Sequence, residues 1–237
     1  MGKEPNGCFP CILTAMESSL PRLPHHPEKL GGLRRATVQN PLRVFCSGCL
    51  LGWSCGVDGG DSGMGGAADF FLNSPLVEAV PFCPEDFTLG TPRDLPDIHG
   101  GDGFAVWQGK ARVLDSTGGD CTEAMKAGAE AALELALKQR VELALLTDMS
   151  AACGSQVISD GGRLQLPRKY RRGVGVTTAL FLKHGIPVCS QRDFHTLAKI
   201  QRHLDPDFPW PENASDHHQT AWYREYFSID HQFEGES

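Results

Sequence analysis

Short apolar segments alternate with longer segments of helical periodicity along the middle of the chain. The apolar segments predict strands at residues 43–46, 78–82, 111–114, 141–146 and 186–189. The segment 141–146 is almost wholly apolar, which is typical of a strand buried on both faces of a parallel sheet. Turns rich in glycine, serine or proline follow most of these segments, so polar and reactive side chains gather at the predicted strand ends.

Helical patterns fill the spaces between the predicted strands. The alanine- and leucine-rich run 121–140 predicts the longest helix, and the run 174–184 predicts another, which Gly185 closes. A third helix begins at Asp193 and runs to about Leu204, and a short one lies within residues 56–75. Strands alternating with helices predict an α/β, Rossmann-like domain, with a mainly parallel sheet flanked by helices.

Both ends of the chain differ from this middle part. Residues 1–40 are rich in proline, glycine and charge without periodicity, so we expect a disordered leader and a domain over residues 41–204. A chain that starts near Leu42 should therefore fold and remain active. Residues 205–237 are polar with scattered aromatics and predict an appended segment. Histidines and an acid in it suggest a second metal site, although such polar tails are usually solvated; these are Asp216, His217, His218 and His231.

Composition and charge narrow the class of protein. The 237 residues are 41% hydrophobic and 22% charged, as in an ordinary globular protein, and the net charge of −7 argues against a large nucleic-acid-binding surface. The sequence contains no apolar run long enough for a membrane span and begins without a secretory signal pattern. The nine cysteines are therefore expected as thiols or metal ligands in the reducing cytoplasm.

Cysteines follow the predicted strands at the points where the strands end. In a parallel sheet, ligands bind beyond the carboxyl ends of the strands, and these ends lie along one edge. We therefore expect a thiol-rich site there, built from Cys46, Cys49, Cys83, Cys153 and Cys189.

The residue types at this edge favour a soft metal. Thiolates select zinc or iron–sulfur clusters, and three protein ligands leave one position open, as in a catalytic site. Glu85 follows Cys83 closely, and Ser150 and Ser155 flank Cys153. A carboxylate and a hydroxyl beside an open metal position supply an acid–base group and a hydrogen-bond donor. The alternative for Glu85 is a structural charge at a helix N-terminus.

Several motifs together resemble the thiouracil desulfidase family, over residues from about 43 to 189. They occur in the order and approximate spacing of that family. The motifs are Ser47-Gly48-Cys49-Leu50-Leu51-Gly52, Val57-Asp58-Gly59-Gly60, Cys83-Pro84-Glu85, Thr91-Pro92-Arg93, Gly100-Gly101-Asp102-Gly103 and Ser150-Ala151-Ala152-Cys153-Gly154.

The resemblance implies a hydrolytic, non-redox enzyme with a [4Fe–4S] cluster. By resemblance, Cys49, Cys83 and Cys153 hold the cluster and leave one iron open for the sulfur of a small thiolated pyrimidine such as 2-thiouracil. Glu85 and Ser150 match the acid–base glutamate and the hydrogen-bonding serine of the family. The product would carry C=O in place of C=S.

The chain departs from the family pattern at three positions near these residues. The family typically has Ser-Ala-Cys and Ser-Pro-Ser-Cys-Gly, whereas this chain has Gly48, Ala151 and Ala152 at the differing positions. Ala152 replaces the second serine. Cys55 lies close to the first ligand turn and is the candidate for a spare or substitute ligand.

Two other functions remain open from the residues. The first is a zinc-binding structural or interaction module that uses Cys46, Cys49 and Cys55, with Cys8 and Cys11 as further ligands. The second is a redox protein whose dithiol is Cys46-Ser47-Gly48-Cys49.

Overall fold

The computed structural model of the chain describes residues 24, 27–61, 63–66 and 68–233. A four-stranded parallel sheet forms its centre, in the order β2-β1-β5-β8. The strands are β1 (Leu42–Ser47), β2 (Val77–Phe82), β5 (Leu143–Leu146) and β8 (Val188–Ser190). All four residues of β5 are buried, as their unbroken apolar run predicted.

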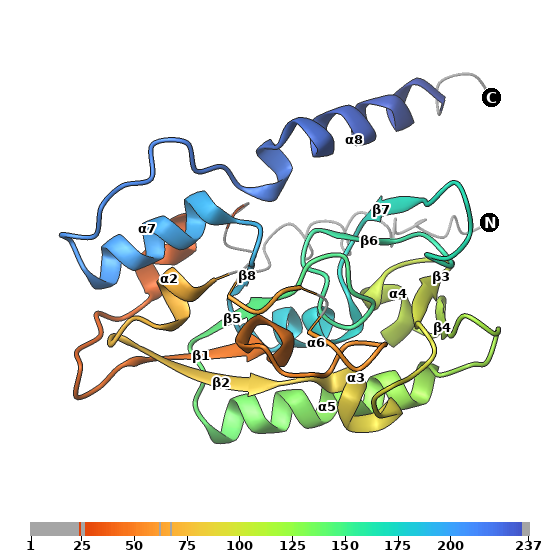
Figure 1. Ribbon diagram of the computed structural model, residues 1–237, viewed down its shortest axis with the longest axis horizontal. Helices are drawn as coiled ribbons and strands as arrows, with labels where there is room; N and C mark the ends of the chain where they lie inside the picture. Colours follow the sequence, from red (N-terminus) through yellow and green to blue (C-terminus); the bar gives the residue numbers. More distant parts are fainter. Residues whose placement is uncertain (1–23, 25–26, 62, 67, 234–237) are drawn as a thin grey trace, which may run out of the picture.

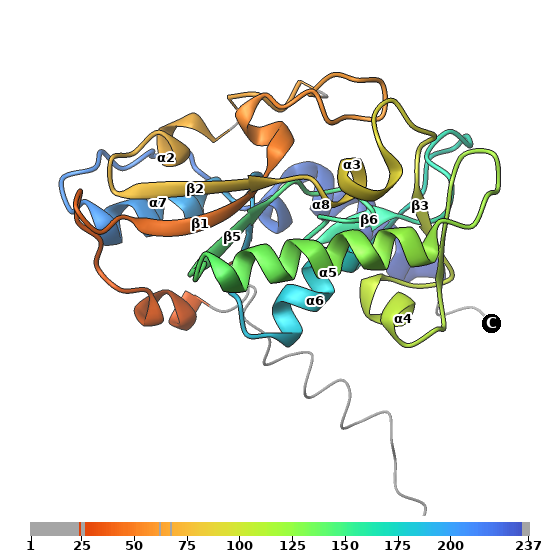
Figure 2. The same ribbon diagram turned by 90° about the horizontal axis from the view of Figure 1, so that it is seen from below.

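Helices cover both faces of the sheet (Figures 1 and 2). Successive residues of β1 point to opposite faces, so Phe45 packs in one apolar cluster and Val44 in the other. The Phe45 cluster includes α5 (Thr122–Lys138) and α6 (Val176–Lys183). The Val44 cluster includes α2 (Asp69–Leu72) and α7 (Phe194–Leu204). This arrangement confirms the predicted Rossmann-like α/β fold.

Smaller elements lie beyond the carboxyl ends of the strands. The 3-10 helix η2 (Gly48–Leu51) follows β1, and α3 (Pro84–Leu89) follows β2. Two antiparallel ladders join β3 (Asp97–His99) to β4 (Arg112–Leu114) and β6 (Val157–Ser159) to β7 (Tyr170–Arg172), and α4 (Gly103–Trp107) lies between β3 and β4 in the chain. The strand predicted at residues 111–114 therefore exists, but it pairs with β3 outside the central sheet.

The N-terminal stretch expected to be a leader divides into two parts. Residues 1–23 and 25–26 lie outside the described residues. Residues 27–40 contain the 3-10 helix η1 (Pro27–Gly32), and Leu33 and Ala36 are buried in the Val44 cluster. The Arg34 guanidinium forms two contacts with the Glu142 carboxylate, at 2.6 and 2.9 Å. These residues therefore pack on the domain, because they bring apolar side chains to it.

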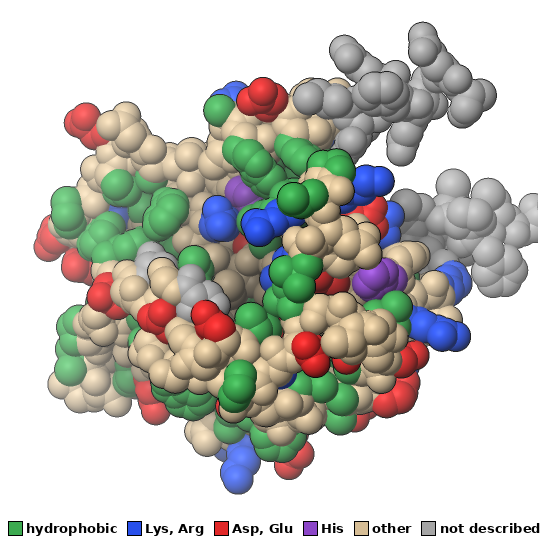
Figure 3. Space-filling view, turned by 45° about the vertical axis from the view of Figure 1, so that its right-hand side comes forward, with side chains coloured by type: hydrophobic (Ala, Val, Ile, Leu, Met, Phe, Trp, Pro, Cys, Tyr) green, Lys and Arg blue, Asp and Glu red, His purple; other side chains and the backbone are tan. Residues whose placement is uncertain are grey.

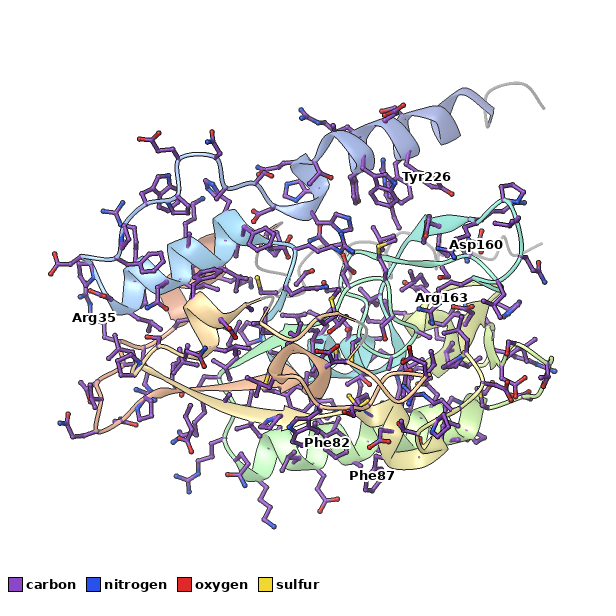
Figure 4. All side chains as sticks on the ribbon, viewed as in Figure 1. Arg35, Phe82, Phe87, Asp160, Arg163 and Tyr226 are labelled. Atoms are coloured by element: carbon purple, nitrogen blue, oxygen red, sulfur yellow. The ribbon has the colours of Figure 1, made fainter. Side chains whose placement is uncertain are left out.

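The C-terminal stretch leaves α7 and crosses to the other end of the sheet. It forms the 3-10 helix η3 (His217–Gln219) and then α8 (Ala221–Phe233), which runs above β6 and β7 in Figure 1. Tyr226 projects from α8 toward this ladder in Figure 4, and its hydroxyl accepts a hydrogen bond from the Tyr170 backbone N–H at 2.8 Å. The predicted appended segment therefore contacts the domain near the carboxyl ends of the strands.

The surface carries charges of both signs. On the face shown in Figure 3, basic and acidic side chains are interspersed, so this face presents no extended basic surface. Within the described residues, no helix is both long enough and apolar enough to span a bilayer.

Candidate active site

The order of the strands creates a crevice at the end of β1. The chain passes from β1 to β2 on one side and later to β5 on the other, and such a reversal leaves space beyond the carboxyl ends. Cys49 lies in η2 after β1, Cys83 directly follows β2, and Cys153 lies in the loop after β5. All three line one cavity of about 230 Å³. Three strand ends thus bring three thiols to one place, as predicted.

A fourth thiol stabilises negative charge on two of these cysteines. The hydrogen bond from the Cys55 thiol is the largest influence on Cys49 and, with Thr147 at 3.0 Å, lowers its pKa to about 7 against the effect of burial. The same thiol lowers the pKa of Cys83, whose sulfur also accepts the Asp86 N–H at 3.4 Å. The single proton of the Cys55 thiol is shared between these two sulfurs, and the pKa of Cys55 is raised in turn. Cys49 and Cys83 are therefore suited to act as thiolates.

The loop that carries Cys153 is packed tightly against the start of α6. The carbonyls of Ala151 and Ala152 accept the backbone N–H groups of Val176 and Thr177, each at 2.9 Å, so the loop satisfies donors that a helix N-terminus leaves unpaired. A Cβ at Gly175 would lie 2.3 Å from the Ala152 carbonyl oxygen. Glycine at this position therefore permits the close approach.

Burial is the largest influence on the pKa of the Cys153 thiol. It is the main reason that the pKa of Cys153 is raised, and a hydrogen bond from Ser47 opposes it only in part. Without a metal, this thiol would keep its proton, whereas a soft metal would replace the proton.

Glu85 is held in the cavity between a cation and a hydroxyl. It lies in the first turn of α3 and is 8% exposed. Its Oε2 accepts the Arg93 guanidinium at 2.8 Å, and its Oε1 accepts the Ser150 hydroxyl at 3.0 Å. Arg93 also donates to the Cys55 carbonyl oxygen at 3.0 Å, which ties the carboxylate to the cysteine turn. This carboxylate lines the cavity with both oxygens paired, so its setting goes beyond that of a charge at the end of a helix.

Ser150 begins the turn that leads to Cys153. Its hydroxyl oxygen accepts the backbone N–H groups of Ala152 at 3.2 Å and Cys153 at 3.0 Å, while its proton points to Glu85. Ser155, the other flanking serine, is buried outside the cavity lining. Ala152 is fully buried in the Phe45 cluster, so this residue does not belong to the cavity lining.

The structure does not bring two of the predicted strand-end cysteines into the cavity. Cys46 and Cys189 lie inside their strands and are fully buried in the Val44 cluster, where burial raises the pKa of Cys46 to about 12. The strand registers explain the correction, because alternate residues of a strand point into a packed face. Cys121 is half-buried and away from the cavity lining, and Cys8 and Cys11 lie outside the described residues.

The positions of the cysteines also argue against the two alternative functions, a zinc-binding module and a dithiol redox protein. Among the residues that the structure describes, no three His, Cys, Asp or Glu side chains lie close enough to hold a single metal ion, as a zinc module requires. A cluster differs, because its thiolates bind separate iron atoms. A dithiol redox pair needs two accessible thiols, and the burial of Cys46 does not suit that role.

Sequence reasoning missed the role of Arg93 and the backbone of the cavity loop. Arg93 stood in a recognised motif, but its pairing with Glu85 arises from a turn and has no periodic signal. Met149 lines the cavity with a φ angle of 64°, a left-handed backbone that is uncommon outside glycine. Such strained residues cluster at functional sites, but only a structure reveals them.

Comparison with known proteins gives consistent matches. The model of the family described as 2-thiouracil desulfurase matches residues 44–193. The chain is 32% identical over 159 residues to the uncharacterized protein YbbK of Bacillus subtilis (strain 168), a match that covers 65% of this chain and 99% of YbbK. It is also similar to the solved structure of the [4Fe-4S]-dependent thiouracil desulfidase TudS, with a TM-score of 0.55 and 33% identity over 68% of this chain and 97% of TudS.

Proposed function

The chain belongs to the 2-thiouracil desulfurase family, and we propose that it is a [4Fe–4S]-dependent desulfidase that converts C=S to C=O in a thiolated nucleobase such as 2-thiouracil. One observation carries the proposal: three thiols from three strand ends line the same cavity as the Glu85–Ser150 pair. The similar protein TudS is described as a [4Fe-4S]-dependent thiouracil desulfidase, which supports the same cofactor here.

The donor set fits an iron–sulfur cluster. Cys49, Cys83 and Cys153 come from separate elements around one cavity, so each thiolate can reach a different iron atom. The lowered pKa values of Cys49 and Cys83 favour deprotonation, which metal binding requires. These three cysteines would hold the cluster. When bound, it would supply a Lewis-acidic iron at the position that lacks a thiolate, and such an iron polarises a C=S bond.

Glu85 is the proposed acid–base group. Arg93 and Ser150 hold one oxygen each of its carboxylate, so it enters the cavity in a fixed orientation. It would take a proton from the attacking water and later return one as sulfur leaves the carbon. Positioned acid–base groups typically contribute about 10²–10⁴-fold to rate.

Ser150 is the proposed hydrogen-bond donor to the substrate. Its oxygen is already fixed by two backbone N–H groups, so only the hydroxyl proton must turn from Glu85 toward the substrate. A donor that is held in place in this way stabilises charge that develops in the transition state without reorganisation of the chain.

The reaction balances without an oxidant or reductant. One water molecule supplies the carbonyl oxygen and two protons, and the sulfur leaves as hydrogen sulfide. The substrate carbon keeps its oxidation state, so the proposal is a hydrolysis.

Anaerobic reconstitution with iron and sulfide tests the proposal. The reconstituted chain should be brown, contain about four irons and release sulfide from 2-thiouracil with formation of uracil. Cys121→Ser is a matched control, because this cysteine lies outside the cavity lining. A protein that binds iron stoichiometrically but leaves a panel of thiopyrimidines unchanged would contradict the proposed activity.

A further inference from the structure

A histidine from the C-terminal segment lies buried beside the loop of the candidate active site. His217 belongs to η3, beyond the residues that the family model matches, which end at residue 193. Its side chain is 2% exposed, and its Nδ1 lies 2.6 Å from Oδ2 of Asp148, which is fully buried. Asp148 in turn lines the active-site cavity. The expectation of a solvated tail is therefore wrong for His217.

Asp148 closes the loop that carries Ser150 and Cys153. Its Oδ1 accepts the backbone N–H groups of three residues on the far side of the loop, at 2.9, 3.1 and 3.2 Å; these are Ser155, Gln156 and Val157. One oxygen of the carboxylate thus joins the two ends of the loop. The other oxygen is the one that faces His217.

The histidine is itself held from the side of α7. The Asp193 carboxylate accepts the His217 backbone N–H at 3.1 Å, and the Asp216 carboxylate accepts the backbone N–H and the hydroxyl of Thr196, each at 2.8 Å. The His217 ring also stacks on Trp222 of α8, with centroids 5.5 Å apart and an angle of 11°. Contacts with α7 and α8 therefore hold the ring in place independently of its hydrogen bond to Asp148.

The pair keeps a buried carboxylate charged. Burial by itself would raise the pKa of Asp148, but the hydrogen bond and charge of His217, together with the backbone N–H groups, lower it. Within the described residues, Nε2 of His217 is buried without a hydrogen-bond partner, so Asp148 is the polar partner that orients the ring. Removing the His217 donor would leave a buried carboxylate oxygen unpaired, which is costly for a charged group.

We propose that His217 is a positioning residue that acts through Asp148 to fix the loop 148–157, and hence Ser150 and Cys153, for desulfuration. The C-terminal segment is then part of the active-site scaffold. It contributes His217, which lies outside the residues that the family model matches. The catalytic consequence rests on the proposed function, whereas the effect on the loop does not.

Hydrogen exchange on the full-length protein, purified anaerobically with its cluster, tests this inference. His217→Phe keeps a ring against Trp222 and removes the donor, His217→Asn keeps an N–H near the position of Nδ1, and His184→Phe is an exposed control outside the cavity lining. We expect His217→Phe to accelerate exchange of peptides within 148–157 by about tenfold and to lower kcat by a similar factor, with KM little changed. His217→Asn should restore both values, and His184→Phe should match the wild type.

Two results would overturn the inference. Unchanged exchange in 148–157, with acceleration confined to η3 and α8, would mean that His217 only anchors the tail. A loop that is loosened equally in the Phe and Asn variants would mean that the N–H donor is irrelevant. His217→Ala replaces the Phe variant if the larger ring prevents folding. Because the exchange readout is independent of turnover, it remains decisive even if thiouracil proves not to be a substrate.

Discussion

The Ser150 hydroxyl donates a hydrogen bond to Oε1 of Glu85 at 3.0 Å, although the two residues are 65 positions apart in the chain. One follows β5 and the other follows β2, and β1 lies between these strands. Arg93 holds the second oxygen of the same carboxylate. The parallel sheet thus orients a buried carboxylate with turns that are distant in sequence.

Replacing Glu85 by Gln should separate catalysis from cofactor binding. The amide cannot take the proton, so kcat should fall by about 10²–10⁴-fold, while the visible spectrum and iron content of the cluster stay as in the wild type. Arg93 loses its charged partner in a buried setting, so the thermal midpoint should also fall. Steady-state assays of uracil formation and a melting curve check both effects. Wild-type turnover in this variant would remove Glu85 from the mechanism.

Replacing Ser150 by Ala should have a smaller effect on turnover. We expect a loss of about tenfold to a hundredfold in kcat, because one donor to the substrate is removed. The alanine also leaves the N–H groups of Ala152 and Cys153 without their acceptor, so exchange of these amides should accelerate. Kinetics and hydrogen exchange measured on the same preparation check the two effects. A variant with unchanged kcat would leave Ser150 as a structural residue of the turn.

Single cysteine replacements should divide the thiols into two groups. Alanine at Cys49, Cys83 or Cys153 should abolish stable cluster binding, because each supplies a thiolate from a different strand end. Cys55→Ala should keep the iron content but raise the pKa of the Cys49 thiol in the metal-free protein, since its main stabilising hydrogen bond is lost. Iron analysis after anaerobic reconstitution checks the assignment. Full iron content in Cys49→Ala would show that the ligand set is wrong.

The strands and the thiol-rich edge were predictable because their signals are local. An apolar run such as residues 143–146 identifies a buried strand by itself, and the position of Cys83 directly after a strand is readable from neighbouring residues. The family motifs added the ligand set and the roles of Glu85 and Ser150. These assignments are proposals that rest on the resemblance, whereas the turn that brings Cys55 beside Cys49 and Cys83 has no signal in the sequence.

The contact between Asp148 and His217 was not predictable, because it joins residues that are distant in sequence. Asp148 and His217 are 69 residues apart, and each alone has the pattern of a solvated polar residue. Their burial follows from their pairing, which depends on how the segment after α7 returns to the sheet. The prediction for Cys189 was wrong in the opposite way. Its place at the end of an apolar run suggested a residue of the site, but the register of β8 points its side chain into the core.

Removing residues 1–41 should cost stability and spare activity. The deletion takes away Leu33 and Ala36, which are buried against the sheet, and the bidentate contact between Arg34 and Glu142. Loss of these contacts should lower the free energy of unfolding by about 2–4 kcal/mol, and kcat per cluster should not change. A chain that starts at Pro27 keeps these contacts and is the matched control, so it should melt at a higher temperature than the chain that starts at Leu42. Equal melting of both truncations would mean that these buried contacts contribute little.

Asp193 should make stability fall as pH rises from about 5 to 8. Burial, with the nearby charges of Asp216 and Asp148, raises the pKa of this carboxyl to about 8, although backbone N–H groups oppose the shift. The folded chain therefore keeps a proton that the unfolded chain has already released near its usual pKa. Below the pKa of the unfolded chain, Asp193 does not reduce the free energy of unfolding. As the pH rises from there to the pKa of the folded chain, the free energy of unfolding falls by up to about 1.4 kcal/mol per pH unit.

Asp193→Asn removes this titration while keeping the shape of the side chain. The thermal midpoint of the wild type should fall relative to that of the variant by about 3–5 °C per pH unit between pH 5 and 8. Groups far from Asp193 that titrate in both proteins cancel in the difference, and so does any loss of the cluster on melting. Parallel midpoint curves for the two proteins would mean that Asp193 is already ionised at neutral pH, and its carboxylate would then be held by the N–H groups of Ser190 and His217.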